Sequence, residues 1–174
     1  GSGVSDIVAL NDHQFLVDER DGKGLGDGSN AVVKKFYIID IAGATDITNM
    51  TATEAANYYV PKSTSPLVDM VALLVANGVP ASEIPSKIEG LAFGADVTLN
   101  GTVEHTLWVA NDNDFVPATS GPNRFWVVGF TNADLSAAFP QSAGFQPQVV
   151  PEPASFALLL GGLAGLAGLA RRRR

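Results

Sequence analysis

The chain of 174 residues contains no cysteine, which excludes disulfide bonds, thiolate metal sites and a cysteine nucleophile. Basic residues are also scarce outside the C-terminus. Without the four arginines at 171–174, 7 basic residues stand against 18 acidic ones, a net charge of −11. Such an acidic surface is a poor partner for nucleic acid, whose phosphates require neutralisation by lysine or arginine. We therefore expect no nucleic-acid binding, and a surface suited to cations or to solubility.

The first ten residues, GSGVSDIVAL, lack the features of a secretory signal peptide. They contain no initiator methionine, no basic stretch and no sufficiently long apolar stretch. The C-terminus described next is typical of proteins that are first exported. We therefore expect this chain to be the C-terminal part of a longer protein.

The chain ends in an apolar stretch with a basic cluster behind it. Pro151, Glu152 and Pro153 interrupt regular structure, residues 154–170 carry no charge, and Arg171, Arg172, Arg173 and Arg174 follow. A helix of this length spans about 25 Å, close to the ~30 Å hydrocarbon core of a membrane, and snorkelling arginines can cover the difference. Because clustered arginines remain cytoplasmic, we expect a transmembrane helix with the body of the protein on the opposite side.

These three parts, in this order, resemble the PEP-CTERM sorting signal of Gram-negative bacteria. The resemblance implies recognition and cleavage by exosortase, an integral-membrane transpeptidase. It also implies inner-membrane anchoring with a periplasmic body, followed by display at the cell surface or secretion. The alternative is an ordinary C-terminal tail anchor. Gly161 and Gly165 form a GxxxG pair, which can pack two helices but arises easily in a sequence so rich in glycine and alanine.

The remaining sequence predicts a mainly β protein with one inserted helix. Apolar, β-branched and aromatic runs predict strands at 6–10, 14–18, 31–41, 88–93, 105–110 and 124–130. Apolar spacing predicts a helix at 66–77 and a shorter one at 133–139, while 19–30 and 95–101 are expected to be loops. Trp108 and Trp126 are expected in the core. We divide the chain into a body, 1–139, an exposed linker, 140–150, and the sorting signal, 151–174.

Two parts of the body follow a similar order of elements. In each, a short strand is followed by a turn, a longer strand that ends in polar residues, a loop and an aromatic strand; the first runs from Ile7 to Ile39 and the second from Gly90 to Val128. Repeated sheet units arranged around an axis form a β-propeller. The pattern alone is equally compatible with two unrelated meanders.

Several ordered segments resemble the phytase-like family, also called "esterase-like activity of phytase". They are DIVALNDHQFLVDERDGKGLGDGS, VKKFYIIDIAGATDI, KIEGLAFGADV, HTLWVANDNDF and PNRFWVVGF, within about residues 5–130. The resemblance implies a partial β-propeller consisting of the last blades of a longer domain. It implies hydrolysis of phosphate or carboxylate esters only for some members.

Acidic and amide side chains follow the ends of both longer strands. If the two parts are true repeats, these strand ends lie at one surface, where clustered oxygen ligands suit Ca²⁺. The candidate ligands are Asp18, Glu19, Asp21, Asn111, Asp112, Asn113 and Asp114, and Glu89 resembles the inward glutamate of metal-binding propellers. The alternative is that these residues are turn formers. The 18–29 loop lacks the closing glutamate of an EF-hand.

Catalytic candidates are few. Arg20 and Lys23 are candidates for binding a phosphate group, although Arg20 is flanked by acidic residues and an ion pair is the alternative. His13 and His105 lie in no nucleophile motif, and no G-x-S-x-G sequence occurs. We therefore expect either a metal-assisted ester hydrolase at the cell surface or a non-catalytic propeller. The latter would bind or assemble extracellular polysaccharide.

Overall fold

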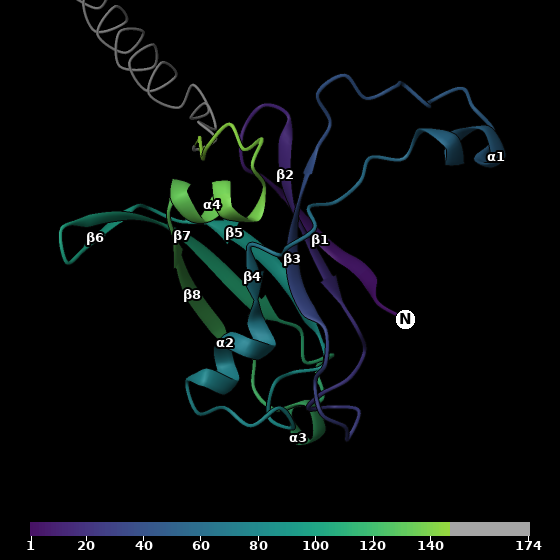
Figure 1. The fold of residues 1–174 in the computed structure, drawn as a ribbon. Helices are drawn as coiled ribbons and strands as arrows, with labels where there is room; N and C mark the ends of the chain where they lie inside the picture. Colours follow the sequence, from purple (N-terminus) through teal and green to yellow (C-terminus); the bar gives the residue numbers. More distant parts are fainter. Residues whose placement is uncertain (147–174) are drawn as a thin grey trace, which may run out of the picture.

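The computed structural model describes residues 1–146 as a mainly β protein with two antiparallel sheets and a few short helices (Figure 1). The predictions for the sorting signal and for the helix at 154–170 lie outside these residues. Within 1–146, no helix is long and apolar enough to cross a membrane. The two sheets do not form a closed propeller.

The first sheet is a four-stranded meander. It consists of β1 (Gly3–Ala9), β2 (Gln14–Arg20), β3 (Lys34–Asp40) and β4 (Val68–Asp69), in that order. Alternate side chains turn inward, as the period of two in a strand requires, so Leu16, Phe36 and Ile38 are fully buried. The predicted hairpin of the first two strands is confirmed, and β3 is shorter than predicted.

The second sheet is built around its longest strand, β7 (Thr102–Asn111). This strand pairs with β5 (Ile88–Phe93), β6 (Val97–Leu99) and β8 (Phe125–Phe130). The stretch containing β6 was expected to be a loop, and that expectation was wrong. Asn100 and Gly101 both have positive φ, which allows the tight turn that joins β6 to β7 as a hairpin.

The two sheets share one pattern of register. Leu16 of β2 lies opposite Ile38 of β3, and Trp108 of β7 lies opposite Val127 of β8 at the corresponding place. Each first strand also carries an irregularity at the same position, between Val4 and Asp6 in β1 and between Ile88 and Gly90 in β5. The two meanders therefore share one strand order, one register and one position of the irregularity, as two copies of one unit would.

This register corrects the alignment of the first strands by one residue. Val17 and Val109 are equivalent, and their partners are Ile7 in β1 and Leu91 in β5. The sequence comparison had matched Ile7 with Gly90. Equivalent residues can now be assigned across the β1–β2–β3 and β5–β7–β8 units.

The helices are short and lie at the periphery: α1 (Ala52–Ala55), η1 (Ala56–Tyr58), α2 (Met70–Ala76), α3 (Pro117–Ser120) and α4 (Asn132–Ala138). The predicted helix at 66–77 begins later, because Val68 pairs with Phe36 as β4 and Asp69 caps the helix by accepting a hydrogen bond from the Ala72 N–H. Met70 and Leu74 are its buried residues.

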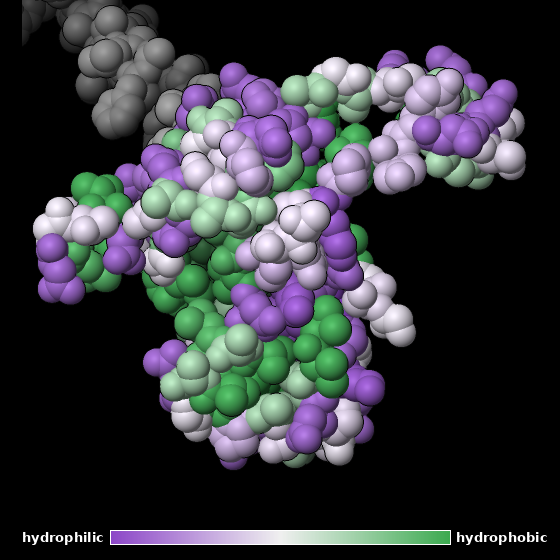
Figure 2. Space-filling model, in the orientation of Figure 1, coloured by the Kyte–Doolittle hydropathy of each residue, from purple (hydrophilic) through white to green (hydrophobic). Residues whose placement is uncertain are grey.

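Two segments project from the body in Figure 1, the β6–β7 hairpin and the stretch that carries α1. Between them, hydrophobic surface gathers around α2 and strands β7 and β8 in Figure 2. A groove of about 400 Å³ lies there, lined by Leu67, Leu73, Val128 and Phe130 among others.

The last described residues are attached to the β1–β2 turn. Gln146 donates a backbone hydrogen bond to the Leu10 carbonyl (2.8 Å), and the Gln14 amide donates to the Gln141 carbonyl (2.9 Å). Phe145 is buried among the rings of Phe93 and Phe130. In the described part of the predicted linker, 140–146, Phe145 is therefore buried where little burial was expected, and residues 147–150 lie outside the described residues.

Candidate functional site

The loops after β2 and β7 converge at one end of the two sheets, which we call the loop end. Leu25, in the loop after β2, donates to the Ile84 carbonyl (2.8 Å), and Ser86 donates back to the Leu25 carbonyl (2.9 Å). Gly24 permits this approach: its φ of 130° disfavours other residues, and a Cβ there would collide with the Ile84 carbonyl. The 21–33 loop is thereby held against the segment that precedes β5.

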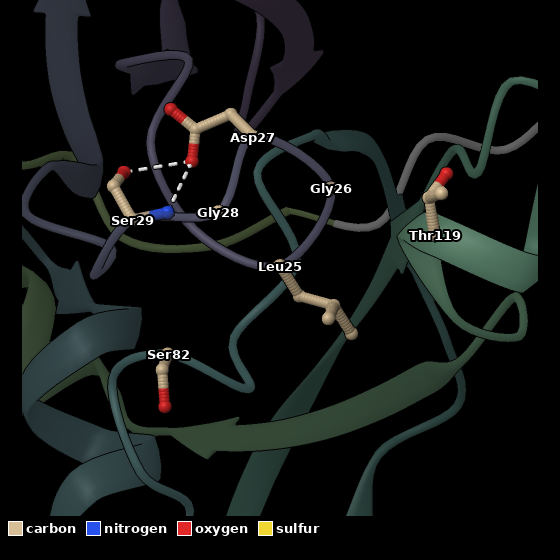
Figure 3. Close-up of a pocket in the computed structure, with 7 residues that line it drawn as sticks. All are labelled: Leu25, Gly26, Asp27, Gly28, Ser29, Ser82 and Thr119. Atoms are coloured by element: carbon tan, nitrogen blue, oxygen red, sulfur yellow. Dashed lines mark hydrogen bonds between the residues drawn. The ribbon is translucent and has the colours of Figure 1, made fainter.

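An open hollow of about 560 Å³ lies at the loop end (Figure 3). Its polar lining comes from Asp27, Ser29, Ser82 and Thr119, which belong to three separate segments. The Asp27 carboxylate accepts hydrogen bonds from the Ser29 hydroxyl (2.7 Å), the Ser29 N–H (3.0 Å) and the Gly24 N–H (2.9 Å). The Ser29 hydroxyl is the largest of the influences that lower the pKa of Asp27, so this carboxylate is ionised at neutral pH.

A second hollow of about 580 Å³ shares Asp27 with the first. It is lined on its other side by Asp21, Gly22 and Lys23. The two hollows place two carboxylates, several hydroxyl groups and one lysine along the loop end. This set of groups can hydrogen-bond a polar ligand, but contains no evident nucleophile–base pair.

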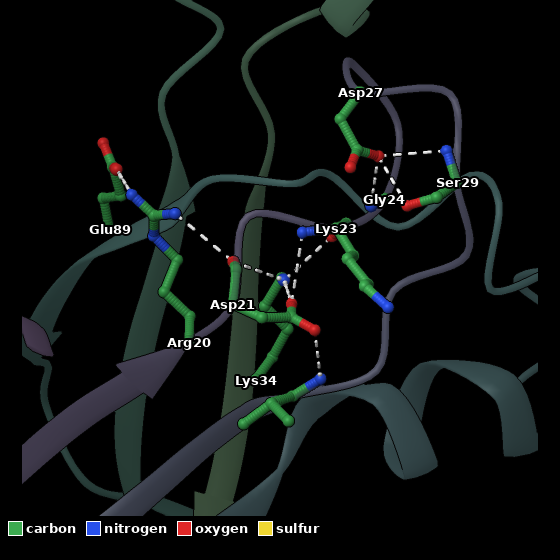
Figure 4. A network of polar contacts seen from close by, with 9 residues as sticks. Arg20, Asp21, Lys23, Gly24, Asp27, Ser29, Lys34 and Glu89 are labelled. Carbon is green, nitrogen blue, oxygen red and sulfur yellow. Dashed lines mark hydrogen bonds and ion pairs between the residues drawn. The ribbon is translucent and has the colours of Figure 1, made fainter. Parts of the chain in front are cut away.

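A buried lysine anchors the loop beneath these hollows (Figure 4). The Lys34 side chain is fully buried, and its ammonium group donates to the Asp21 carboxylate (2.5 Å), the Asp21 carbonyl (3.1 Å) and the Lys23 carbonyl (2.9 Å). All three of its protons are thus used. Burial lowers the pKa of Lys34. Burial also opposes ionisation of Asp21, but the hydrogen bond and charge of Lys34, together with hydrogen bonds from the Val33 and Lys23 N–H groups, outweigh it and keep the pKa of Asp21 low.

Arg20 joins the two sheets. Its guanidinium forms an ion pair with Glu89 of β5 and also donates to the Asp21 carbonyl (3.3 Å). Both side chains are less than a third exposed. The candidate phosphate ligand Arg20 and the candidate metal ligand Glu89 are thus partners in one ion pair between the sheets.

Asp18 differs from the charged residues described above because its carboxylate has no hydrogen-bond partner. Its side chain is fully buried between the sheets, and neither carboxylate oxygen has a hydrogen-bond partner. Burial, together with the nearby carboxylates of Asp6 and Glu89, raises the pKa of Asp18 to about 7, despite the opposing charges of Arg20 and Lys34. Near neutral pH this buried group is therefore partly protonated.

The other candidate calcium ligands lie at or near the loop end, each with its own partner. Glu19 pairs with Lys62 and Asp114 with Lys87, and the Asp112 carboxylate accepts from the Asp114 N–H (2.8 Å). The amides of Asn111 and Asn113 bond to backbone groups of 115–124. Within residues 1–146 no three His, Cys, Asp or Glu side chains are grouped to hold a metal ion. Calcium binding stays a prediction.

Both histidines contact a carboxylate. The Nδ1 atom of His13 lies 3.0 Å from Asp40, and that of His105 lies 2.9 Å from Asp96. Such a pair is the orienting half of a Ser-His-Asp triad. In the part of the chain that the structure describes, no serine hydrogen-bonds to either imidazole, and His105 packs against Phe130 and Phe145.

Several residues at the loop end escaped the sequence analysis. Ser82 and Thr119 reach the first hollow from distant segments, and no local pattern marks them. For Lys34 the sequence does contain an indication. Lys34 alternates with Phe36 and Ile38 along β3 and therefore points to the same buried face, where a lysine is expected to have a charged partner.

Two family models match parts of the chain. Residues 1–115, about two thirds of the chain, match the model of the family described as "Phytase-like: Esterase-like activity of phytase". The chain belongs to the phytase-like family. The matched region contains the first sheet, β5, β6, β7 and most of the loop end, whereas β8 lies beyond it.

A second match covers the C-terminus. Residues 149–174 match the PEP-CTERM protein-sorting motif. This phytase-like protein thus carries a signal that exosortase recognises, as in exported proteins of Gram-negative bacteria that are anchored in a membrane and then processed. No curated protein and no solved structure gives a significant match.

Proposed function

We propose that this protein is delivered to the cell surface by exosortase and that its body is part of a β-propeller whose loop end binds and hydrolyses phosphate or carboxylate esters. The family match at 1–115 and the sorting motif at 149–174 support the two halves of this proposal. Residues 154–170 would hold the chain in the inner membrane, with Arg171–Arg174 on the cytoplasmic side, until cleavage.

The observation that carries the proposal for the body is the convergence of loops from corresponding strand ends of the two sheets on the first hollow. In a propeller, equivalent loops of successive sheets meet at one face, where ligands bind. Here the loop after β2 and the segments next to β5 and β7 supply Asp27, Ser29, Ser82 and Thr119 to one hollow. Lys23 adds a positive charge at the second hollow.

The roles that these groups can take follow from their chemistry. Lys23 and the hydroxyl groups would orient a phosphate or carboxylate ester by hydrogen bonding. Asp27, whose pKa is lowered by Ser29, would accept a hydrogen bond from substrate or water. A divalent cation bound by the carboxylates of the loop end would polarise the ester or activate water.

Hydrolysis can be measured on the full chain in a non-ionic detergent, with p-nitrophenyl phosphate and p-nitrophenyl acetate as substrates. We expect turnover to fall at least tenfold in Asp27→Asn. The control Asp12→Asn removes an exposed carboxylate from the β1–β2 turn and should retain activity. Turnover that is equal in Asp27→Asn and in the native chain would exclude this hollow as the site.

The metal proposal has its own test. EDTA should lower turnover and Ca²⁺ should restore it, and calorimetric titration with Ca²⁺ should release or absorb heat. The double variant Asp112→Ala with Glu89→Ala should lose the calorimetric signal. A native chain that gives no heat with Ca²⁺ would remove the metal from the mechanism.

A non-catalytic propeller that binds extracellular polysaccharide is the second candidate function. The observation that favours it is the pairing of charges at and around the loop end: Arg20 with Glu89, Lys34 with Asp21 and Lys87 with Asp114. Groups held in such pairs stabilise the loops and are less available for catalysis. Retention of the native chain on a polysaccharide column, combined with no turnover of either ester, would favour this function.

A further inference from the structure

The first hollow of the loop end presents its ligand mainly with hydrogen-bond acceptors. The three hydrogen bonds that residues 1–146 donate to the Asp27 carboxylate all end on Oδ1, and Oδ2 remains for a ligand (Figure 3). The Ser29 hydroxyl uses its proton on Asp27 (2.7 Å), and the Thr119 hydroxyl donates to the Val116 carbonyl (3.3 Å). Both hydroxyl oxygens keep lone pairs that can accept a hydrogen bond. A ligand that fits these groups therefore donates hydrogen bonds.

The charge of this hollow is negative. In the part of the chain that the structure describes, Asp27 is the one charged side chain of its lining, and Ser29 holds the pKa of Asp27 below its usual range. Lys23 lines the second hollow, whereas Arg20 and Lys34 are held in ion pairs with carboxylates. A phosphate group is anionic and accepts hydrogen bonds, so it would meet a like charge and further acceptors here. The first hollow therefore disfavours phosphate.

The loop that forms this hollow is held from both sides. Gly26 lies between hydroxyl groups of two separate segments, and a Cβ added to it would be 3.0 Å from the Oγ atoms of both Ser86 and Ser120. The half-buried Leu25 side chain adds an apolar surface to the polar lining (Figure 3). Apolar contact combined with a few placed polar groups is typical of small-ligand sites. A sugar ring matches both, since its hydroxyl groups donate and its C–H face packs on apolar side chains.

We propose that the first hollow binds a neutral sugar residue. Hydroxyl groups of the sugar donate to Oδ2 of Asp27 and to the oxygens of Ser29 and Thr119. The C–H face of the ring contacts Leu25, and Ser82, on the segment before β5, can both donate and accept. Sugar binding stands by itself, whereas the ester rests on the proposed function, which this site narrows to carboxylate esters of neutral sugars. Water cleaves the acyl–oxygen bond of such an ester, giving a carboxylic acid and the free sugar hydroxyl.

Cations are the other ligands that a set of acceptors attracts. Ca²⁺ takes roughly 6–8 oxygen ligands. Within residues 1–146, the side chains that line the first hollow supply one carboxylate and three hydroxyl groups. A cation would also gain nothing from the apolar contact with Leu25. A sugar therefore uses the whole lining and a cation only part of it, and competition with Ca²⁺ distinguishes the two.

Trp108 is a rival position for a sugar on this chain. It was expected in the core, but it is 45% exposed, and for this chain that expectation was wrong. Exposed tryptophan rings are large amphipathic surfaces on which the C–H face of a sugar can pack. Trp108 lines a separate hollow of about 200 Å³, together with Ala92 and Phe125. Trp108→Leu therefore tests whether a bound sugar lies there instead.

Saturation-transfer NMR measures sugar binding to the full chain in a polyoxyethylene detergent, which contains no sugar. The matched probes are methyl glucoside and its phosphate ester. We expect the dissociation constant of methyl glucoside to be at least tenfold lower than that of the phosphate.

Variants of the lining locate the bound sugar. Asp27→Asn should raise the dissociation constant of methyl glucoside at least tenfold and reduce the discrimination against the phosphate, because it removes the charge that attracts donors and repels anions. Ser82→Ala and Thr119→Val should each raise that constant at least threefold. Trp108→Leu and the control Thr98→Val, an exposed position on the projecting β6–β7 hairpin, should leave it unchanged.

Hydrolysis is followed separately, with the acetate ester of methyl glucoside and the phosphate ester as substrates. Sugar binding that depends on Asp27, without hydrolysis of either ester, would support the sugar site and refute the proposed hydrolysis. Hydrolysis of the phosphate at least as fast as that of the acetate, and lost in Asp27→Asn, would refute the sugar site and leave the proposed function intact.

Three binding results would also overturn the proposal. The first is a native chain that binds methyl glucoside no more tightly than its phosphate. The second is loss of binding in Trp108→Leu but not in Asp27→Asn, which would place the sugar in the other hollow. The third is displacement of methyl glucoside by Ca²⁺, which would assign the first hollow to a cation. Circular dichroism checks the fold, and Ser82→Ala and Thr119→Val replace Asp27→Asn if that variant is unfolded.

Discussion

The buried carboxyl of Asp18 predicts that the protein loses stability as the pH rises through neutrality. The folded state raises the pKa of this group from 3.8 to about 7, chiefly because burial opposes its charge. Each tenfold change in proton affinity is worth about 1.4 kcal/mol, so keeping Asp18 ionised would cost the folded state about 4 kcal/mol. The contribution is most favourable below pH 4, declines between pH 4 and 7, and is lost above pH 7.

The groups that face Asp18 come from every neighbouring strand. Asp6 and Glu89 oppose its ionisation, and Arg20 and Lys34 favour it. Carboxyls with lowered pKa, such as Asp21, have the opposite dependence: they stabilise the protein above their ordinary pKa and lose this contribution only as the pH falls below it. The loss of stability at acid pH and the loss of stability as the pH rises through neutrality therefore occur in separate ranges of pH.

Urea unfolding of the full chain in detergent, followed by tryptophan fluorescence, measures the effect. For a slope of about 2 kcal/mol per molar, the contribution of Asp18 lowers the midpoint by about 2 M between pH 4.5 and pH 8. Asp18→Asn removes the titrating group and should reduce this difference to less than about a quarter, while Asp12→Asn should retain it. Equal pH dependence in Asp18→Asn and the native chain would refute the reasoning.

Three further substitutions test the packing around the loop end and the sheets. Gly24→Ala should lower the free energy of unfolding by more than about 1 kcal/mol, because Gly24 has a positive φ and an added Cβ would collide with a carbonyl group. The control Gly22→Ala should change the free energy of unfolding little, because a Cβ at Gly22 would lie in open space. Lys34→Met leaves the largely buried carboxylate of Asp21 without its cation and should cost about 3 kcal/mol by urea unfolding. Thr131→Ala removes the capping box of α4 and should cost about 1 kcal/mol in the same assay.

The strands were predictable because alternation and β-branched residues mark them locally. β1, β2, β5, β7 and β8 all lie where the pattern placed them, within a few residues. Strand β6 was not predicted, although Asn100–Gly101 is a strong signal for a hairpin turn. The strand has only three residues, and the turn-forming residues on both sides of it suggested a loop. The start of α2 was misplaced because the pairing of Val68 with β3 is a tertiary contact that competes with local helix propensity.

The loop end was less predictable, for a physical reason. The acidic and amide residues after β2 and β7 are visible in the sequence, but their partners come from distant segments. Nothing near Asp21 indicates that Lys34 will bond to it, and nothing near Arg20 indicates Glu89, 69 positions away. The burial of Asp18 without a partner follows only from the packing of one sheet on the other.

The attachment of residue 146 to the β1–β2 turn determines how the body would be presented at a membrane. The turn lies at the start of β2 and the hollows at its end, about 20 Å apart at ~3.4 Å per residue. If the sorting segment tethers the chain, the tether leaves from the end opposite the hollows. Those hollows would then open towards the surrounding medium, accessible to large substrates that could not enter the space between protein and bilayer.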